Sequence, residues 1–236
     1  MHRARRLMVL ACSGLLLTAT ACTHPGSSTG DAKVSAASSG WSESKGGSGL
    51  SLTEKVGKLK VARESRAGYE REKFKLWVDE DHDGCDTRKE VLLSEAVKKP
   101  RQGEDCRLTG GTWRSYYDDK TVTDARKLDI DHVVPLAEGW DSGASTWTAE
   151  RREAYANDLD AERSLVAVSL SSNRAKGDRD PAEWLPPATD ALCTYATDWV
   201  ATKLRWNLSA DRAEIKALHK IAKGCKDATV TYTPAP

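Results

Sequence analysis

Residues 127–136 have the sequence KLDIDHVVPL, and this stretch decides the fold. The run from Leu128 to Val134 has the apolar and β-branched residues of a strand, and a proline follows it. Within the run, Asp131 and His132 are adjacent. Taken alone, such a pair is most often two ordinary strand residues, although a carboxylate and an imidazole are also common in metal and proton-transfer sites. Other residues of the chain must show whether Asp131 and His132 belong to a functional site.

A second predicted strand lies at 165–170, where the sequence is LVAVSL. The residues SSNRAKGD follow at once, and Asn173 is placed to open a short helix. Strand, loop, strand and helix are therefore predicted in that order along the chain.

Three other segments have the apolar spacing or the capping residues of helices. They are 148–155, which Asn157 is predicted to end, 189–206, and a helix that begins after Ser209 as its N-cap. Strands and helices do not alternate regularly, so the pattern predicts the α+β class. Residues 50–236 have the length of one domain, and no internal repeat is present.

The first 21 of the 236 residues predict an export signal, because three arginines precede an apolar run too short to span a bilayer. Cys22 follows directly, which leaves two alternatives: cleavage that releases a secreted protein, or lipid attachment to Cys22. We predict the lipid-anchored form, held at the outer face of the bacterial plasma membrane. Residues 22–49 are rich in Gly and Ser, and this composition predicts a flexible tether.

Four cysteines are left for pairing in the exported chain once Cys22 is set aside. An oxidising compartment favours disulfides over zinc thiolates, and three connectivities are open. We predict that neighbours in sequence pair, which joins Cys85 to Cys106 and Cys193 to Cys225.

The charge balance excludes a broad basic coat. The chain has 36 basic and 35 acidic residues, and three of the arginines lie in the signal, so the exported chain has 33 basic against 35 acidic residues and a formal charge of −2. Any contact with nucleic acid must therefore come from local basic patches.

Several segments together resemble a known family. They include GCDTRKEVL, GGTWRSYYDD, LDIDHVVPLAEGWDSGASTW and LVAVSLSSNRAKGDRDPAEWLPP, and the match covers about 69–225. The chain resembles the HNH, or ββα-metal, nucleases, and most closely the exported proteins related to the C-terminal nuclease part of GmrSD-type restriction enzymes. The resemblance implies a ββα-metal core at about 127–187 within a mostly helical, disulfide-stapled domain. It also implies hydrolysis of phosphodiester bonds in DNA, with RNA as an alternative substrate.

The family pattern assigns roles to individual residues. His132 is the expected general base, because imidazole titrates near neutral pH, and its alternative is a buried structural histidine. Asp131 and Asn173 are the expected ligands of one Mg²⁺ or Mn²⁺, although Asn173 is also a reasonable helix N-cap. Lys176, one turn beyond Asn173, is the expected catalytic contact to a phosphate oxygen.

Three arginines are further candidates for phosphate contacts. Arg71 and Arg88 match family positions, and Arg174 follows Asn173 directly. Surface ion pairs or a bracing role in the core are the alternatives for these arginines.

One position departs from the commonest HNH pattern, in which an asparagine near the start of the second strand orients the catalytic histidine. Ser164 stands at that place. Either this serine or a backbone carbonyl is expected to satisfy the second imidazole nitrogen. Asn157 matches the closer relatives, and helix capping is its favoured role.

The sequence DEDHDGCDTRKE at 79–90 has the spacing of a calcium loop. Asp79, Asp81, Asp83 and Glu90 are the candidate ligands of a structural Ca²⁺. An acidic loop without an ion is the alternative, because Asp86 replaces the usual apolar residue. This loop also suggests a second function, a catalytically inactive, calcium-dependent surface binding lipoprotein on an HNH framework. The sequence predicts no protein partner.

Overall fold

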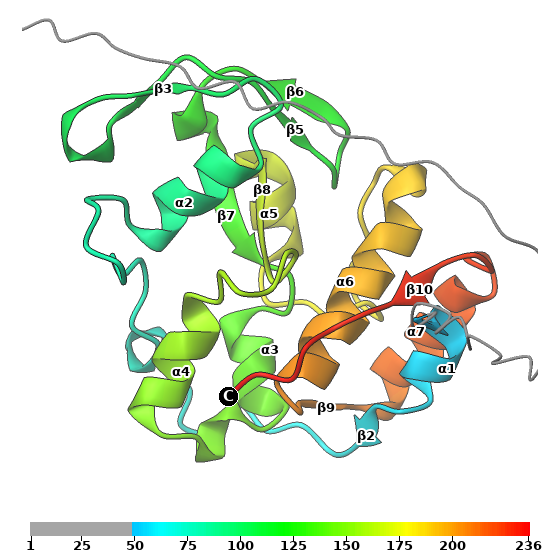
Figure 1. Cartoon of the computed structure of the whole chain (residues 1–236). Helices are drawn as coiled ribbons and strands as arrows, with labels where there is room; N and C mark the ends of the chain where they lie inside the picture. The colour runs from blue at the N-terminus through cyan, green and yellow to red at the C-terminus, as the bar shows by residue number, and fades with distance from the viewer. Residues whose placement is uncertain (1–48) are drawn as a thin grey trace, which may run out of the picture. The chain divides into compact units, whose positions relative to one another are not determined.

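A computed structural model describes residues 49–236, and one of its two longest strands lies within residues 127–136. Strands β7 (Leu128–His132) and β8 (Leu165–Ser169) pair antiparallel, with His132 opposite Leu165 (Figure 1). β7 ends two residues earlier than predicted, and Val133 and Val134 continue as buried chain beyond it.

Helix α5 (Leu170–Lys176) begins directly after β8 and packs on both strands. Its N-cap is Ser169, whose hydroxyl accepts from the backbone N–H of Ser172, so the prediction that Asn173 opens the helix is wrong. Asn173 lies inside the helix, and its side chain is therefore free of any capping role.

The other elements surround this strand pair. The remaining α-helices are α1 (Leu52–Val56), α2 (Thr87–Ser94), α3 (Leu136–Asp141), α4 (Ala149–Ala156), α6 (Leu192–Arg205) and α7 (Arg212–Ala222). Short strands form four further pairs: β1 (Leu50–Ser51) with β10 (Thr229–Val230), β2 (Lys60–Val61) with β9 (Ser209–Ala210), β3 (Arg101–Gln102) with β4 (Leu108–Thr109), and β5 (Trp113–Ser115) with β6 (Lys120–Val122). Single turns of 3₁₀-helix lie at η1 (Arg71–Lys73), η2 (Glu104–Cys106), η3 (Ala125–Lys127), η4 (Ala144–Thr146) and η5 (Thr189–Ala191). The β2–β9 pair is parallel and the others are antiparallel.

Two of the three predicted helices have the expected capping or position. Thr148 caps the start of α4, and Asn157 follows its last residue. α6 lies within the predicted range, whereas α7 is capped by Asp211 rather than Ser209. The prediction that Ser209 caps this helix is wrong because Ser209 lies in strand β9, where it pairs with Lys60 of β2.

The strand pair lies between two apolar clusters, which explains why every residue of β8 is buried. Val166 and Val168 belong to the larger cluster with α6 and α7, and Leu165 and Ala167 belong to a smaller one with α2 and Trp113. β7 and β8 therefore hold the two halves of the core together.

Both predicted disulfides are present in the structure. Cys85 is bonded to Cys106, and Cys193 in α6 is bonded to Cys225 beyond α7. The predicted signal, Cys22 and nearly all of the predicted tether lie outside the described residues. Between residues 49 and 236, no helix is both long and apolar enough to cross a membrane.

Candidate active site

A pocket of about 220 Å³ lies where β7 ends and is lined by most of the residues predicted for catalysis, metal binding and phosphate contacts. Asp131, His132 and Asn173 line it together with Arg71 and Arg174. Residues that are up to 103 positions apart in the chain, from Arg71 to Arg174, therefore meet around one small, polar cavity.

His132 is buried, with 7% of its surface exposed, and its Nε2 lies 2.9 Å from the backbone oxygen of Ala156. A carbonyl oxygen only accepts, so Nε2 carries the proton and Nδ1 has a free lone pair. Burial lowers the pKa of His132 to about 4, the charges of Arg71 and Lys176 add to this effect, and the hydrogen bond to Ala156 opposes it. The imidazole is therefore neutral at pH 7.

The backbone, rather than Ser164, satisfies the second nitrogen of His132. The hydroxyl of Ser164 donates to Oδ2 of Asp158 at 3.0 Å, and its carbonyl accepts from the N–H of Val133. Of the two orienting groups expected from the sequence, the carbonyl is the one that contacts the ring.

Asp131 is held through one of its two carboxylate oxygens. Its Oδ2 accepts from the hydroxyl of Tyr117 at 2.6 Å and from Nζ of Lys176 at 2.6 Å. Both contacts use the same atom, which leaves Oδ1 for another partner.

Lys176 is placed differently from the prediction. Its side chain is fully buried, pairs with Asp131, and donates to the backbone oxygen of His132 at 2.9 Å. Burial raises the pKa of Asp131 and lowers the pKa of Lys176, while the ion pair opposes both shifts. A buried ammonium engaged in this way is not available to a substrate phosphate, so the structure corrects the expected phosphate contact to a role in holding Asp131.

Asn173 and Asp129 form a second contact between α5 and β7. Nδ2 of Asn173 donates to Oδ2 of Asp129 at 3.1 Å, which leaves the amide oxygen free. Asp129 and Asp131 share one face of the strand, and Asn173 and Lys176 share one face of the helix. Asn173 of α5 therefore contacts Asp129, and Lys176 of α5 contacts Asp131.

The free oxygens of Asp131 and Asn173 suit a hard divalent cation. Mg²⁺ and Mn²⁺ prefer carboxylate and carbonyl oxygens and commonly keep several positions for water and phosphate. The two hydrogen bonds engage Nδ2 of Asn173 and Oδ2 of Asp131, so the Oδ1 oxygen of each side chain could serve as a ligand. The donor set therefore fits the predicted metal.

The three arginines separate into two groups. Arg71 and Arg174 are exposed and line the pocket. Arg88 instead donates through Nη2 to the backbone oxygens of Ala125 and Leu128, at 3.2 and 2.7 Å. Its contacts are those of a brace at the start of β7, which was the alternative considered for it.

The predicted calcium loop closes on itself. The carboxylates of Asp79, Asp81 and Asp83 approach within 4.8 Å of one another, and Asp83 also lies close to Glu90. Backbone N–H groups already occupy some of these oxygens, including Oδ2 of Asp79, which accepts from Gly84 at 3.0 Å. Burial, followed by the neighbouring aspartates, raises the pKa of Glu90. Calcium binding stays a prediction.

Sequence reasoning missed two side chains that hold the site, and it did not identify which backbone carbonyl contacts His132. Tyr117 lies in the GGTWRSYYDD segment, whose family match was the only signal for it. Asp129 alternates with Asp131 in the strand, and this spacing was a usable signal. No sequence feature pointed to the carbonyl of Ala156, because every residue has such a carbonyl and this one lies 24 positions from His132.

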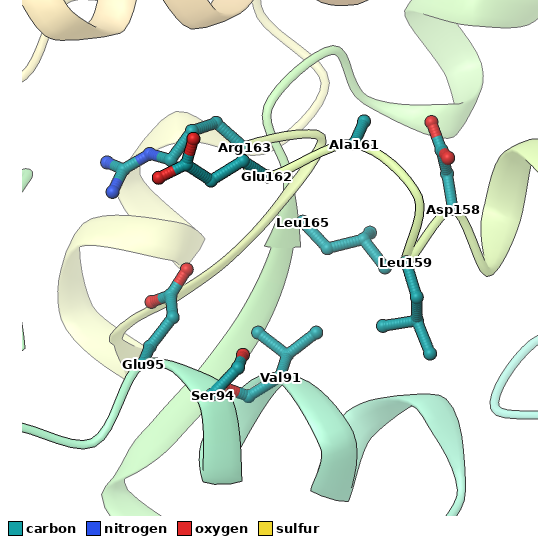
Figure 2. Close-up of a pocket in the computed structure, with 9 residues that line it drawn as sticks. All are labelled: Val91, Ser94, Glu95, Asp158, Leu159, Ala161, Glu162, Arg163 and Leu165. Carbon is teal, nitrogen blue, oxygen red and sulfur yellow. The ribbon is translucent and has the colours of Figure 1, made fainter. Parts of the chain in front are cut away.

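A larger pocket, of about 340 Å³, lies between the end of α2 and the segment before β8 (Figure 2). Its floor includes Val91 and Leu165, and Glu95 points from one side toward the segment that carries Glu162 and Arg163. None of the predicted catalytic or metal-binding residues lines it. Size alone therefore does not identify the active site in this protein.

The pocket therefore combines an antiparallel strand pair, the helix that follows it, a neutral histidine and two side chains with oxygen donors. The chain matches the family of GmrSD restriction endonucleases, C-terminal domain, over residues 86–221, and it belongs to that family. It is also 41% identical over 158 residues to an uncharacterized secreted protein of Arthroderma benhamiae, an alignment that covers 67% of this chain and 76% of the relative. No solved structure matches the chain.

Proposed function

We propose that this protein is a metal-dependent endonuclease that hydrolyses phosphodiester bonds in DNA, with RNA as an alternative substrate. The observation that carries the proposal is the neutral His132, which lines the same pocket as Asp131 and Asn173 and whose Nε2 is held by the carbonyl of Ala156. Family membership supports the same reaction class.

In the proposed mechanism, His132 accepts a proton from the attacking water at Nδ1. The carbonyl of Ala156 holds Nε2–H, so the ring presents the basic nitrogen and stabilises the imidazolium that forms. Arg71 and Arg174 contact the phosphate and offset its developing charge. A divalent ion held by Asp131 and Asn173 would polarise the phosphate and stabilise the leaving oxygen.

Substrate recognition is proposed to depend on the phosphate backbone rather than on base sequence. The exported chain has a near-neutral balance of charge, and the candidate contacts at the pocket are two exposed arginines. Phosphate contacts position a nucleic acid without reading its sequence. We therefore expect low sequence specificity and cleavage that weakens as salt rises.

The test is incubation of the purified protein with plasmid DNA in Mg²⁺ or Mn²⁺, beside a chelator-treated sample. His132→Ala should abolish cutting, and so should the chelator. The matched control is His219→Ala, because His219 is a half-buried histidine in α7 outside the pocket. Wild-type protein that cuts no better than His132→Ala would refute the enzyme and favour the inactive binding protein. The same assay with an RNA substrate shows whether the protein cleaves DNA, RNA or both.

We also propose that the protein is exported. Two disulfides and a relative named as a secreted protein support this location. Lipid attachment at Cys22 rests on the sequence of the leader alone. Mass spectrometry of the native N-terminus tests it: a diacylglyceryl Cys22 supports the anchor, and an unmodified start places the protein in the secreted class.

A further inference from the structure

The residue after Ala156 is the most completely hydrogen-bonded side chain near the pocket. Asn157 is buried, and its Nδ2 donates to the backbone oxygens of Lys75 and Glu153, both at 2.8 Å. Its Oδ1 accepts from the N–H of Val78 at 3.1 Å and from the hydroxyl of Thr87 at 2.8 Å. Both donors and both acceptor positions of the amide are therefore used.

These contacts fix the peptide group that orients His132. The carbonyl of Ala156 and the N–H of Asn157 belong to one planar peptide, so they turn together. The N–H donates to Glu153 at 3.1 Å, and the carbonyl lies in the last turn of α4, where it is free to accept from His132. Anchoring the side chain of Asn157 thus restricts the direction of the carbonyl.

The same amide also positions the other side of the imidazole. Asn157 holds Lys75 and Val78, which flank Trp77, and the Trp77 ring lies 6.0 Å from the His132 ring between centroids. Trp77 has a left-handed φ of 56°, a conformation that a bulky residue adopts only when its neighbours impose it. One side chain therefore controls both a polar and an aromatic neighbour of His132.

We infer that Asn157, braced by Thr87, is the positioning residue that sets the tautomer and the ring orientation of His132. The catalytic consequence rests on the proposed function, whereas the effect on the ring does not. This role differs from the helix cap expected for Asn157, because a cap needs only the contacts to α4.

The main test uses a matched pair at Thr87. Its buried hydroxyl lies 2.8 Å from Oδ1 of Asn157 and 2.9 Å from the oxygen of Val78. Thr87→Val removes the hydroxyl with little change of shape, and Thr87→Ser keeps it. Thr202→Val, at a buried threonine of α6, controls for placing valine in the core. Asn157→Ala is the stronger variant, and the Thr87 pair decides alone if it does not fold.

The first measurement is the ¹⁵N signature of the His132 ring, assigned by its absence from His132→Ala. Wild type, Thr87→Ser and Thr202→Val should show the single Nε2–H tautomer, and Thr87→Val should show a mixture. In DNA cleavage, Thr87→Val should lower kcat about 10–100-fold with KM changed less than about 2-fold, and Thr87→Ser should restore kcat.

Two results would overturn the inference: an unchanged ring signature in Thr87→Val, or equal losses of kcat in Thr87→Val and Thr202→Val. If the wild type cuts no nucleic acid, the proposed function fails, and the ring signature still decides the positioning role.

Discussion

Replacing Lys176 with methionine should destabilise the protein strongly. Lys176 is fully buried, and its Nζ lies 2.6 Å from Oδ2 of Asp131, which is itself 6% exposed. Methionine is similar in length but carries no charge. The variant therefore leaves a buried carboxylate with the hydroxyl of Tyr117 as its remaining side-chain donor.

The expected magnitude follows from the burial of both partners. Removing one member of a buried ion pair costs about 3–5 kcal/mol, because the other charge stays desolvated and uncompensated. For a domain of this size, each kcal/mol lowers the melting temperature by roughly 2–4 °C, so the expected fall is about 6–20 °C. An exposed lysine that only contacts substrate would change stability by less than about 0.5 kcal/mol.

Urea unfolding of wild type, Lys176→Met and the double variant Lys176→Met with Asp131→Asn measures this effect. The double variant should regain much of the lost stability, since it replaces the pair with neutral groups. A loss below about 1 kcal/mol in Lys176→Met, or a double variant less stable than the single one, would refute the reasoning.

Three further outcomes follow from the structure. Burial raises the pKa of Glu95 from 4.5 to about 7, so the folded state binds this proton more tightly than the unfolded chain, and stability should fall as pH rises through that window. Glu95→Gln should remove this slope and gain about 1–3 kcal/mol at pH 8, seen as a difference in urea unfolding between pH 5 and pH 8; equal slopes would contradict it. Replacing Cys193 and Cys225 with serine should cost about 3–4 kcal/mol by the loop-entropy account, and unchanged thermal unfolding would argue against that account. Ca²⁺ should release heat on calorimetric titration and raise the melting temperature, both lost in Asp81→Asn; no response at millimolar ion would leave the acidic loop without an ion.

Local patterns predicted the two strands of the site and the helix α4, but not the start of α5. The apolar runs of β7 and β8 and the Thr148 cap of α4 act over a few residues, so the sequence alone indicated them. The predicted start of α5 was wrong because serine and asparagine are both favourable N-cap residues. Residue preference alone therefore does not choose between Ser169 and Asn173. The strand pairing of Ser209 similarly removed it as the cap of α7, because a long-range contact took precedence over a local preference.

Long-range polar contacts account for what the sequence did not reveal about the site. A lysine three residues beyond the proposed metal ligand Asn173 can contact a phosphate only if its side chain points to solvent. Packing of α5 on β7 turns Lys176 inward, where it meets Asp131 and the backbone of His132. Exposure of one helical residue depends on tertiary packing, which residue type and spacing do not determine.

Adjacent residues in the chain are thus held by different parts of the fold. Asp131 is fixed by α5 and by Tyr117, whereas the ring of His132 is fixed by the end of α4. Lys176 links the two, since its ammonium contacts both the Asp131 carboxylate and the His132 carbonyl. A shift of α4 relative to α5 would therefore change the geometry between the proposed base, His132, and the proposed metal ligand, Asp131, without altering either side chain. Contacts that join these helices to β7 should for this reason affect catalysis even where they lie outside the pocket.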